Sequence, residues 1–367
     1  MSTPSGGASS ESDASSLARW HPQFTGASPA HVDRLSGSGD LPLPHQGHNA
    51  SFAVMAPPTN TQGVQAVAAA RQLPGRAQIA ALIEALRPKQ WIKNVFVLAG
   101  LVFGGQLFDV SSCVRAGVCF AVFCAAASSV YLVNDVFDKA SDAHHPQKRL
   151  RPIASGRLPV PIAVAAACFL ALAALAGSLA LSPPVFTVVV VYLAMTAAYT
   201  SGLKRVFILD VLIVAAGFVL RAVAGAAAVR AEISPWLVCC TFLLATYLAL
   251  GKRRNELTLL GAGARKHRTN LLTYSIPLLD SWLTAIAGAT IVCYALYTQA
   301  SRTVEHFHTT NLMYTVPFVV YALFRYQHLV LRENGGGDPG SSLLRDRGMK
   351  IAIGAWAVVA AFIVYSG

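Results

Sequence analysis

Four polar residues with oxygen-bearing side chains lie close together at the end of a long apolar run. The stretch NDVFDKASD places Asn134, Asp135, Asp138 and Asp142 in the pattern N-D-x-x-D-x-x-x-D. Residues four apart share a helix face, so Asn134, Asp138 and Asp142 are predicted to line one groove. Mg²⁺ prefers one or two carboxylates together with phosphate oxygens and water. The pattern therefore predicts a site for a metal-bound diphosphate.

A cationic segment follows these aspartates directly. It reads HHPQKRLRPIASGRL and holds Lys148, Arg149, Arg151 and Arg157. Alone, such a segment is typical of a cytoplasmic loop. Next to three aspartates it predicts the anion-binding half of a Mg²⁺–phosphate site, where cations neutralise the charge that the metal does not.

Three further segments carry polar residues that we expect on the same membrane face. These residues are Gln90, Lys93 and Asn94 in RPKQWIKN, Tyr199, Lys204 and Asp210 in YTSGLKRVFILD, and Lys252, Arg253, Arg254 and Glu256 in GKRRNEL. Each segment alone is weak evidence for a functional site. Their expected convergence on one membrane face is what indicates such a site.

Arg221 is different because it interrupts an apolar helix, eleven residues after Asp210. An arginine inside a membrane is costly, which makes it a functional candidate by default. A structural ion pair or a bond to helix carbonyls explains it equally well, and the sequence leaves both interpretations open.

The elements that position these residues are membrane spans. The chain has 367 residues, of which 54% are hydrophobic and 13% charged, and its mean hydropathy is +0.51. Soluble proteins carry roughly 25% charged residues. This composition excludes a soluble enzyme, a disordered scaffold and a nucleic-acid-binding domain. It predicts an all-α polytopic membrane protein, because a span in lipid must satisfy its own backbone hydrogen bonds.

Apolar runs and breakers predict about nine spans. They are 94–108, 112–136, 160–181, 184–204, 208–230, 234–251, 281–300, 312–331 and 349–366. Seventeen of the 29 Lys and Arg residues lie in or beside the loops after even-numbered spans, against three after odd-numbered ones. This asymmetry predicts a cytoplasmic N-terminus and a cytoplasmic polar face. The net charge of +12 then reflects loops and lipid headgroups, with no nucleic-acid partner.

Residues 1–75 differ from the rest and are rich in Ser, Gly and Pro. We expect a disordered tail there, or a start assigned too early, with Met55 as a later candidate, and no cleavable signal peptide. Residues 76–367 form the predicted catalytic domain. The seven cysteines lie in or beside apolar runs and are expected to act as small buried hydrophobes.

NDVFDKASD resembles the first aspartate-rich motif of the UbiA-type prenyltransferase superfamily, whose members are nine-helix intramembrane enzymes. The resemblance covers residues 80–367 and is strongest to the decaprenyl-phosphate phosphoribosyltransferase branch. It rests on RPKQWIKN, YLVNDVFD, HPQKRLRPIASG, YTSGLK, LRAVAG, KRRNEL and LLRDR (343–347).

The resemblance implies a reaction in which a polyprenyl (decaprenyl) phosphate attacks the anomeric carbon of 5-phosphoribosyl-1-diphosphate and releases diphosphate. In that branch the product feeds cell-wall arabinan synthesis. The resemblance also implies a Mg²⁺ cofactor and a plasma (inner) membrane location, and a homo-oligomer is left open. The acceptor oxygen is already anionic, so positioning and leaving-group neutralisation should supply most of the acceleration.

The resemblance assigns roles by motif. It implies Asp138, Asp135, Asp210 and Glu256 as catalytic residues and Asn134, Asp138 and Asp142 as metal ligands. The substrate-binding residues that it implies are Gln90, Lys93, Asn94, Lys148, Arg149, Arg151, Tyr199, Lys204, Arg221, Lys252 and Arg253.

One departure separates this chain from much of the superfamily. Many members carry a second D-x-x-x-D motif, but here Asp210 is followed by Val214. This favours the phosphoribosyl branch over an aromatic prenyltransferase that uses a polyprenyl diphosphate. A non-catalytic lipid-phosphate transporter is the third alternative, and it would scatter its acids through the bundle.

Overall fold

The structure is a computed structural model that describes residues 75–145, 147–260, 273–332 and 346–366. These ranges contain helices and their connections and no β-strand, so the all-α fold class is confirmed. Of the predicted tail, residues 1–74 lie outside the described residues. All described residues belong to one unit, Asn60–Gly367.

Seven described helices are long and apolar enough to cross a membrane. They are α4 (Val110–Phe137), α6 (Val160–Leu181), α7 (Pro183–Ser201), α8 (Leu209–Ala228), α9 (Pro235–Leu260), α10 (Ile276–Gln299) and α14 (Arg347–Ser366). The side chains of Asp109, Ser182 and Ser275 accept backbone N–H bonds at the starts of α4, α7 and α10. Such caps satisfy donors that the first helical turn leaves unpaired.

The count of nine spans is not confirmed, because two of them are broken. The first, predicted over 94–108, is the 3₁₀ helix η1 (Pro88–Leu98) followed by the short α3 (Ala99–Phe103). The eighth, predicted over 312–331, divides into η6 (Asn311–Thr315) and α12 (Val316–Arg332). Runs of 3₁₀ helix beyond three or four residues are uncommon, so η1 is an unusual element.

Two glycines allow the first span to lie directly against α8. A Cβ added to Gly100 would lie 2.4 Å from the Ala226 backbone nitrogen, and one added to Gly225 would lie 1.8 Å from the Val97 carbonyl oxygen. The backbone of η1 and α3 therefore contacts the backbone of α8. Gly225 belongs to the LRAVAG motif, so this motif is a packing surface for the first span.

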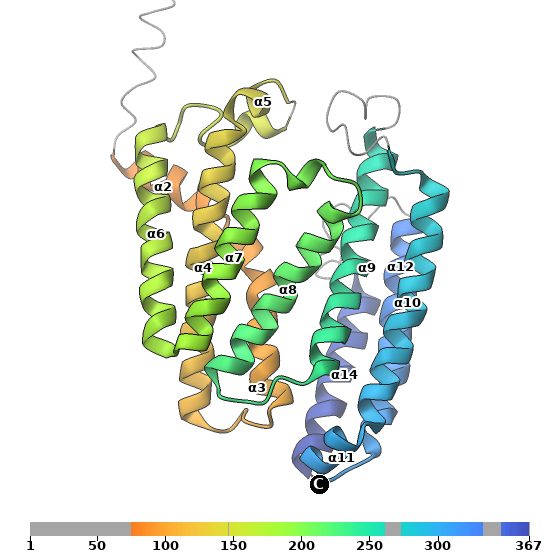
Figure 1. The fold of residues 1–367 in the computed structure, drawn as a ribbon. Helices are drawn as coiled ribbons and strands as arrows, with labels where there is room; N and C mark the ends of the chain where they lie inside the picture. The colour runs from red at the N-terminus through yellow and green to blue at the C-terminus, as the bar shows by residue number, and fades with distance from the viewer. Residues whose placement is uncertain (1–74, 146, 261–272, 333–345, 367) are drawn as a thin grey trace, which may run out of the picture. The chain divides into compact units, whose positions relative to one another are not determined.

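Short elements connect the long helices at both ends. They are α2 (Gly75–Leu86), α5 (Lys139–Ala143), η2 (Lys148–Leu150), η3 (Leu203–Arg205) and α11 (Ser301–Phe307). Figure 1 shows α2 and α5 at the end of the long helices opposite α3 and α11. The predicted polar segments lie at the end that carries α5. Helix α9 extends beyond the predicted 234–251, so GKRRNEL is helical.

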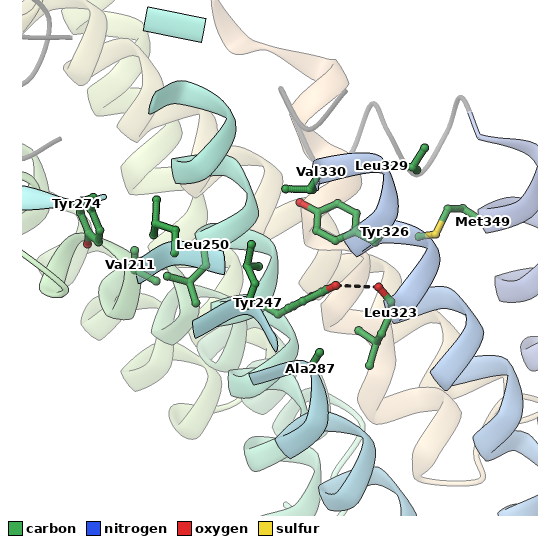
Figure 2. Close-up of a cluster of buried hydrophobic side chains, with 12 residues drawn as sticks. Val211, Tyr247, Leu250, Tyr274, Ala287, Leu323, Tyr326, Leu329, Val330 and Met349 are labelled. Carbon is green, nitrogen blue, oxygen red and sulfur yellow. Dashed lines mark hydrogen bonds between the residues drawn. The ribbon is translucent and has the colours of Figure 1, made fainter. Parts of the chain in front are cut away.

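Buried side chains hold neighbouring helices together, as the cluster of α9, α10 and α12 shows (Figure 2). There the Tyr247 hydroxyl donates to the Leu323 carbonyl at 2.7 Å. In lipid, packing and such interhelical hydrogen bonds replace the hydrophobic effect as the force between helices. Outward-facing apolar residues such as Phe169, Ile351 and Phe362 are each 71% exposed, which fits a surface covered by lipid.

Candidate active site

The aspartate-rich motif lies where α4 ends and the chain turns into α5. Asp135 and Asp142 are each only 3% exposed. Arg151 bridges them, with its Nη1 3.1 Å from Asp135 Oδ1 and 2.6 Å from Asp142 Oδ2. Arg87 pairs with the same Asp135 oxygen and stacks on the Tyr131 ring. Two arginines thus neutralise the two buried carboxylates.

The other two motif residues contact α7 and the connection after it. Thr200 donates to Asn134 Oδ1 at 2.6 Å, and Lys204 Nζ lies 3.2 Å from Asp138 Oδ1. The Asp138 side chain is 38% exposed. Asp138 is therefore the accessible carboxylate of the motif, and its lysine partner comes from the YTSGLK segment.

A second ionic group joins the start of α8 to the end of α9. Arg253 Nε lies 2.7 Å from Asp210 Oδ2, and Arg253 Nη1 donates to Glu256 Oε2. Asp210 is fully buried. The Arg253–Asp210 pair is close but lacks hydrogen-bond alignment, so Asp210 Oδ2 and Arg253 Nε are the buried side-chain polar atoms without a hydrogen bond among the described residues.

Arg221 lies in a cage of neutral groups. Its Nε donates to Asn94 Oδ1 at 2.7 Å, its Nη1 to the Gly217 carbonyl at 2.7 Å and its Nη2 to the Tyr192 hydroxyl at 2.9 Å. The Phe123, Tyr192 and Phe218 rings surround the guanidinium. These contacts match the structural interpretation of Arg221. They also bury Asn94, which anchors η1 to α8.

The remaining predicted substrate-binding residues lie at the same end of the long helices. Gln90 and Lys93 are half-buried on η1, Tyr199 is half-buried near the end of α7, and Lys252 is half-buried on α9. Lys148 and Arg149 are exposed on η2. The structure thus brings four separate segments to the two ionic groups, while Arg221 lies deeper within α8.

The predicted metal ligands have three different partners, namely Thr200, Lys204 and Arg151. Within the described ranges, no three His, Cys, Asp or Glu side chains gather as a metal site. The donor set still fits Mg²⁺ in kind, because it offers hard oxygen donors, an accessible Asp138 and an Asp210 oxygen that lacks a hydrogen bond. The metal assignment stays a prediction.

Three residues that contact the predicted site residues were not themselves predicted from the sequence. Arg87 and Thr200 lie within or beside the quoted motifs RPKQWIKN and YTSGLK, so those motifs were the available signal. Tyr274 contacts Asp210 from the connection before α10, where no pattern marked it.

The fold and site define a helical membrane protein with an ionic, phosphate-compatible site at one end of the long helices. The model of the UbiA prenyltransferase family matches residues 94–339, and the chain belongs to this family. It is an integral, multi-pass membrane protein and a transferase of the UbiA type, so the family resemblance is confirmed.

The curated relatives narrow the comparison. The chain is 35% identical over 303 residues to a decaprenyl-phosphate phosphoribosyltransferase of Mycolicibacterium smegmatis, which covers 80% of this chain and 95% of the relative. It is 35% identical over 296 residues to the protein of that name from Corynebacterium glutamicum, covering 77% of this chain and 86% of the relative.

Solved structures show the same fold at low identity. A UbiA homolog from Archaeoglobus fulgidus bound to DMAPP and Mg²⁺ superposes with a TM-score of 0.61 at 16% identity, covering 78% of this chain and 99% of that chain. The same homolog bound to Cd²⁺ gives a TM-score of 0.55 at 17% identity, covering 77% and 96%.

Proposed function

We propose that the protein transfers 5-phosphoribose from 5-phosphoribosyl-1-diphosphate to a polyprenyl (decaprenyl) phosphate, with release of diphosphate. The observation that carries this proposal is the pairing of cations from separate segments with the acids of the motifs at one end of the helices. Lys204 lies against Asp138, and Arg253 against Asp210. The 35% identity to two decaprenyl-phosphate phosphoribosyltransferases supports the choice of donor.

In the proposed reaction an oxygen of the lipid phosphate forms a bond to the anomeric carbon, and the bond from that carbon to the diphosphate breaks. Mg²⁺, when bound, supplies positive charge for the leaving diphosphate. Asp138 and Asn134 would hold it, with Asp210 on metal-bound water or a ribose hydroxyl. Lys93, Lys204, Lys252 and Arg253 would orient phosphates, and this fixed positive charge stabilises the charge that develops on the leaving group.

An apolar cavity of about 1060 Å³ supports a lipid acceptor. It lies between η1, α3, α9, α10, α12 and α14 and includes Phe96, Phe103, Leu244, Leu248 and Phe318 in its lining. η1 also carries Gln90 and Lys93, so one element contributes both to the cavity wall and to the polar site. A polyprenyl chain could occupy the cavity while its phosphate lies at the polar end.

The alternative is an aromatic prenyltransferase that uses a polyprenyl diphosphate. It is favoured by one observation, the fold shared with a homolog solved with DMAPP and Mg²⁺. Val214 weighs against it, because the second carboxylate pair that a prenyl diphosphate metal site would use is missing. We propose that the protein lies in the plasma membrane, with its active site and its N-terminus on the cytoplasmic side. We also propose that its product is used in the synthesis of cell-wall arabinan precursors.

A donor comparison tests the proposal. Purified protein with polyprenyl phosphate and Mg²⁺ is given phosphoribosyl diphosphate in one reaction, and a prenyl diphosphate with an aromatic acceptor in another. Diphosphate release only in the first reaction, and its loss on adding EDTA, is the expected result. Release only in the second reaction would replace the proposal by the alternative.

A further inference from the structure

Tyr274 is a buried tyrosine at the edge of the ionic group of α8 and α9. It is 4% exposed, and its ring packs on Phe207 with the centroids 4.7 Å apart and on Trp282 at 6.3 Å. Figure 2 shows it beside Val211, the residue after Asp210. These ring contacts hold the hydroxyl at the start of α8.

The hydroxyl makes two hydrogen bonds of opposite direction. It donates to Asp210 Oδ1 at 2.8 Å, and it accepts from the Ile208 backbone N–H at 3.0 Å. A tyrosine hydroxyl has one hydrogen to donate, so the Ile208 N–H bond leaves that hydrogen for Asp210. Hydrogen bonds in such a chain polarise and strengthen one another. Burial and the bond to Asp210 raise the pKa of Tyr274, which keeps the hydrogen in place.

The backbone at Ile208 is unusual. Its φ is +66°, and a positive φ at a β-branched residue is an outlier that persists only where its surroundings enforce it. The Tyr274 hydroxyl provides one such restraint through the Ile208 N–H. It therefore holds the connection that carries Lys204 at the same time as it holds Asp210.

The two oxygens of Asp210 have different surroundings. Oδ1 is fixed by Tyr274, while Oδ2 faces Arg253 without an aligned hydrogen bond. Leaving a buried acceptor without a hydrogen bond costs free energy, so each native example calls for an explanation. A hydrated metal diphosphate would satisfy both atoms, with a metal-bound water donating to Oδ2 and a diphosphate oxygen accepting from the Arg253 Nε–H.

We propose that Tyr274 is a positioning residue for this site. Its hydroxyl fixes the Asp210 carboxylate so that Oδ2, with Arg253, receives the hydrated metal diphosphate end of the donor. This inference rests on the proposed function for the class of donor. The diphosphate end is common to both donor classes, so a binding measurement with inorganic diphosphate tests Tyr274 independently of the choice between them.

The test compares Tyr274→Phe with the wild type in the full-length protein. Calorimetric titration with Mg²⁺ and inorganic diphosphate should show about ten-fold weaker binding in the variant, the effect of a lost hydrogen bond to a charged group. The ring contacts stay, but Asp210 Oδ1 and the Ile208 N–H lose their partner, so we expect a lower melting temperature in a variant that still folds, and binding is measured on the folded protein. Tyr365→Phe is the matched control, because its hydroxyl also accepts a backbone N–H, from Leu107 at 3.1 Å, away from the site.

Two further variants separate the hydroxyl's roles. In an Asp210→Asn background, Tyr274→Phe should weaken binding by much less than ten-fold, because its target carboxylate is gone. Ile208→Gly tolerates the positive φ without help, and adding it to Tyr274→Phe should not restore binding. Full restoration by glycine would show that the hydroxyl serves only the backbone and would overturn the proposal.

Wild-type affinity in Tyr274→Phe would also overturn it. A wild type that binds magnesium diphosphate but does not consume phosphoribosyl diphosphate would instead contradict the proposed function alone. A wild type that does not bind magnesium diphosphate would contradict both.

Discussion

Asp135 and Asp138 are three residues apart and have opposite surroundings. Asp135 is buried between two arginines, whereas the Asp138 side chain is 38% exposed and faces one lysine. Removing one partner of a buried ion pair leaves an uncompensated charge and is strongly destabilising. Asp135 and Asp142 are therefore buried ion-pair partners at the junction of α4 and α5, and we propose Asp138 as the carboxylate that exchanges its partner for a ligand.

This difference gives the first prediction. Asp138→Ala should abolish turnover, because it removes the proposed metal ligand, while the protein still folds and inserts. Turnover and the melting temperature in detergent are measured together. The control is Asp109→Ala, which removes a carboxylate at the start of the same helix and should leave turnover intact. A folded Asp138→Ala protein with near wild-type turnover would exclude the metal role.

The second prediction concerns the lysines that we propose bind the phosphates of phosphoribosyl diphosphate. A charge-assisted phosphate contact contributes about 1.5–3 kcal/mol, or roughly ten- to hundred-fold in affinity. Lys204→Ala or Lys252→Ala should therefore raise the KM for phosphoribosyl diphosphate by about that factor, with the KM for the lipid little changed. The adjacent, exposed Arg205 gives the control Arg205→Ala, which should behave as the wild type. An unchanged donor KM in both lysine variants would refute this assignment.

Among the elements, the broken first span matters most for the site. η1 carries Gln90 and Lys93, and two residues of α8 hold it in place. Arg221 binds Asn94, and Gly225 lets the Val97 carbonyl approach. Both residues belong to LRAVAG and lie one helical turn apart, so this motif positions the first span.

The third prediction tests that packing. Gly225→Ala should destabilise the protein strongly and lower activity, because a Cβ there would lie 1.8 Å from the Val97 carbonyl oxygen. Gly288→Ala is the matched control, since a Cβ at this helical glycine meets nothing within 4 Å, and Gly to Ala in a helix contributes about 0.5–1 kcal/mol of stability. Melting temperatures of the two variants in one detergent make the comparison. Equal melting temperatures would show that η1 can shift away from α8.

At the scale of the whole molecule, an ionic site lies at one end of the long helices, and an apolar cavity opens beside η1. Seven of the nine predicted spans are long apolar helices in the described residues, because each is a continuous apolar run. The close backbone contact of the first span with α8 at Gly100 and Gly225 could not be predicted, since it depends on tertiary packing, and no pattern marked the division of the eighth span into η6 and α12. The charged motifs contain residues that the structure brings to the two ionic groups, but the sequence did not predict Arg87, Thr200 or Tyr274. Tyr274 comes from the connection before α10, where no pattern marked it.

The fourth prediction concerns residues 1–70. Their composition gives them no apolar core, and the motifs begin at Arg87. Deleting them should leave the specific activity of the detergent-purified protein unchanged. A large loss, at equal folded fraction, would show that the tail contributes to activity.

The most direct test of the central claim is the identity of the lipid product. Phosphoribosyl diphosphate labelled in the ribose carbons is incubated with polyprenyl phosphate, Mg²⁺ and purified protein, and the lipid fraction is analysed by mass spectrometry. We predict one labelled lipid, with the mass of the polyprenyl phosphate plus a phosphopentose, formed in step with diphosphate release and absent in Asp138→Ala. A lipid fraction without ribose label, from protein that converts a prenyl diphosphate and an aromatic acceptor, would contradict the account.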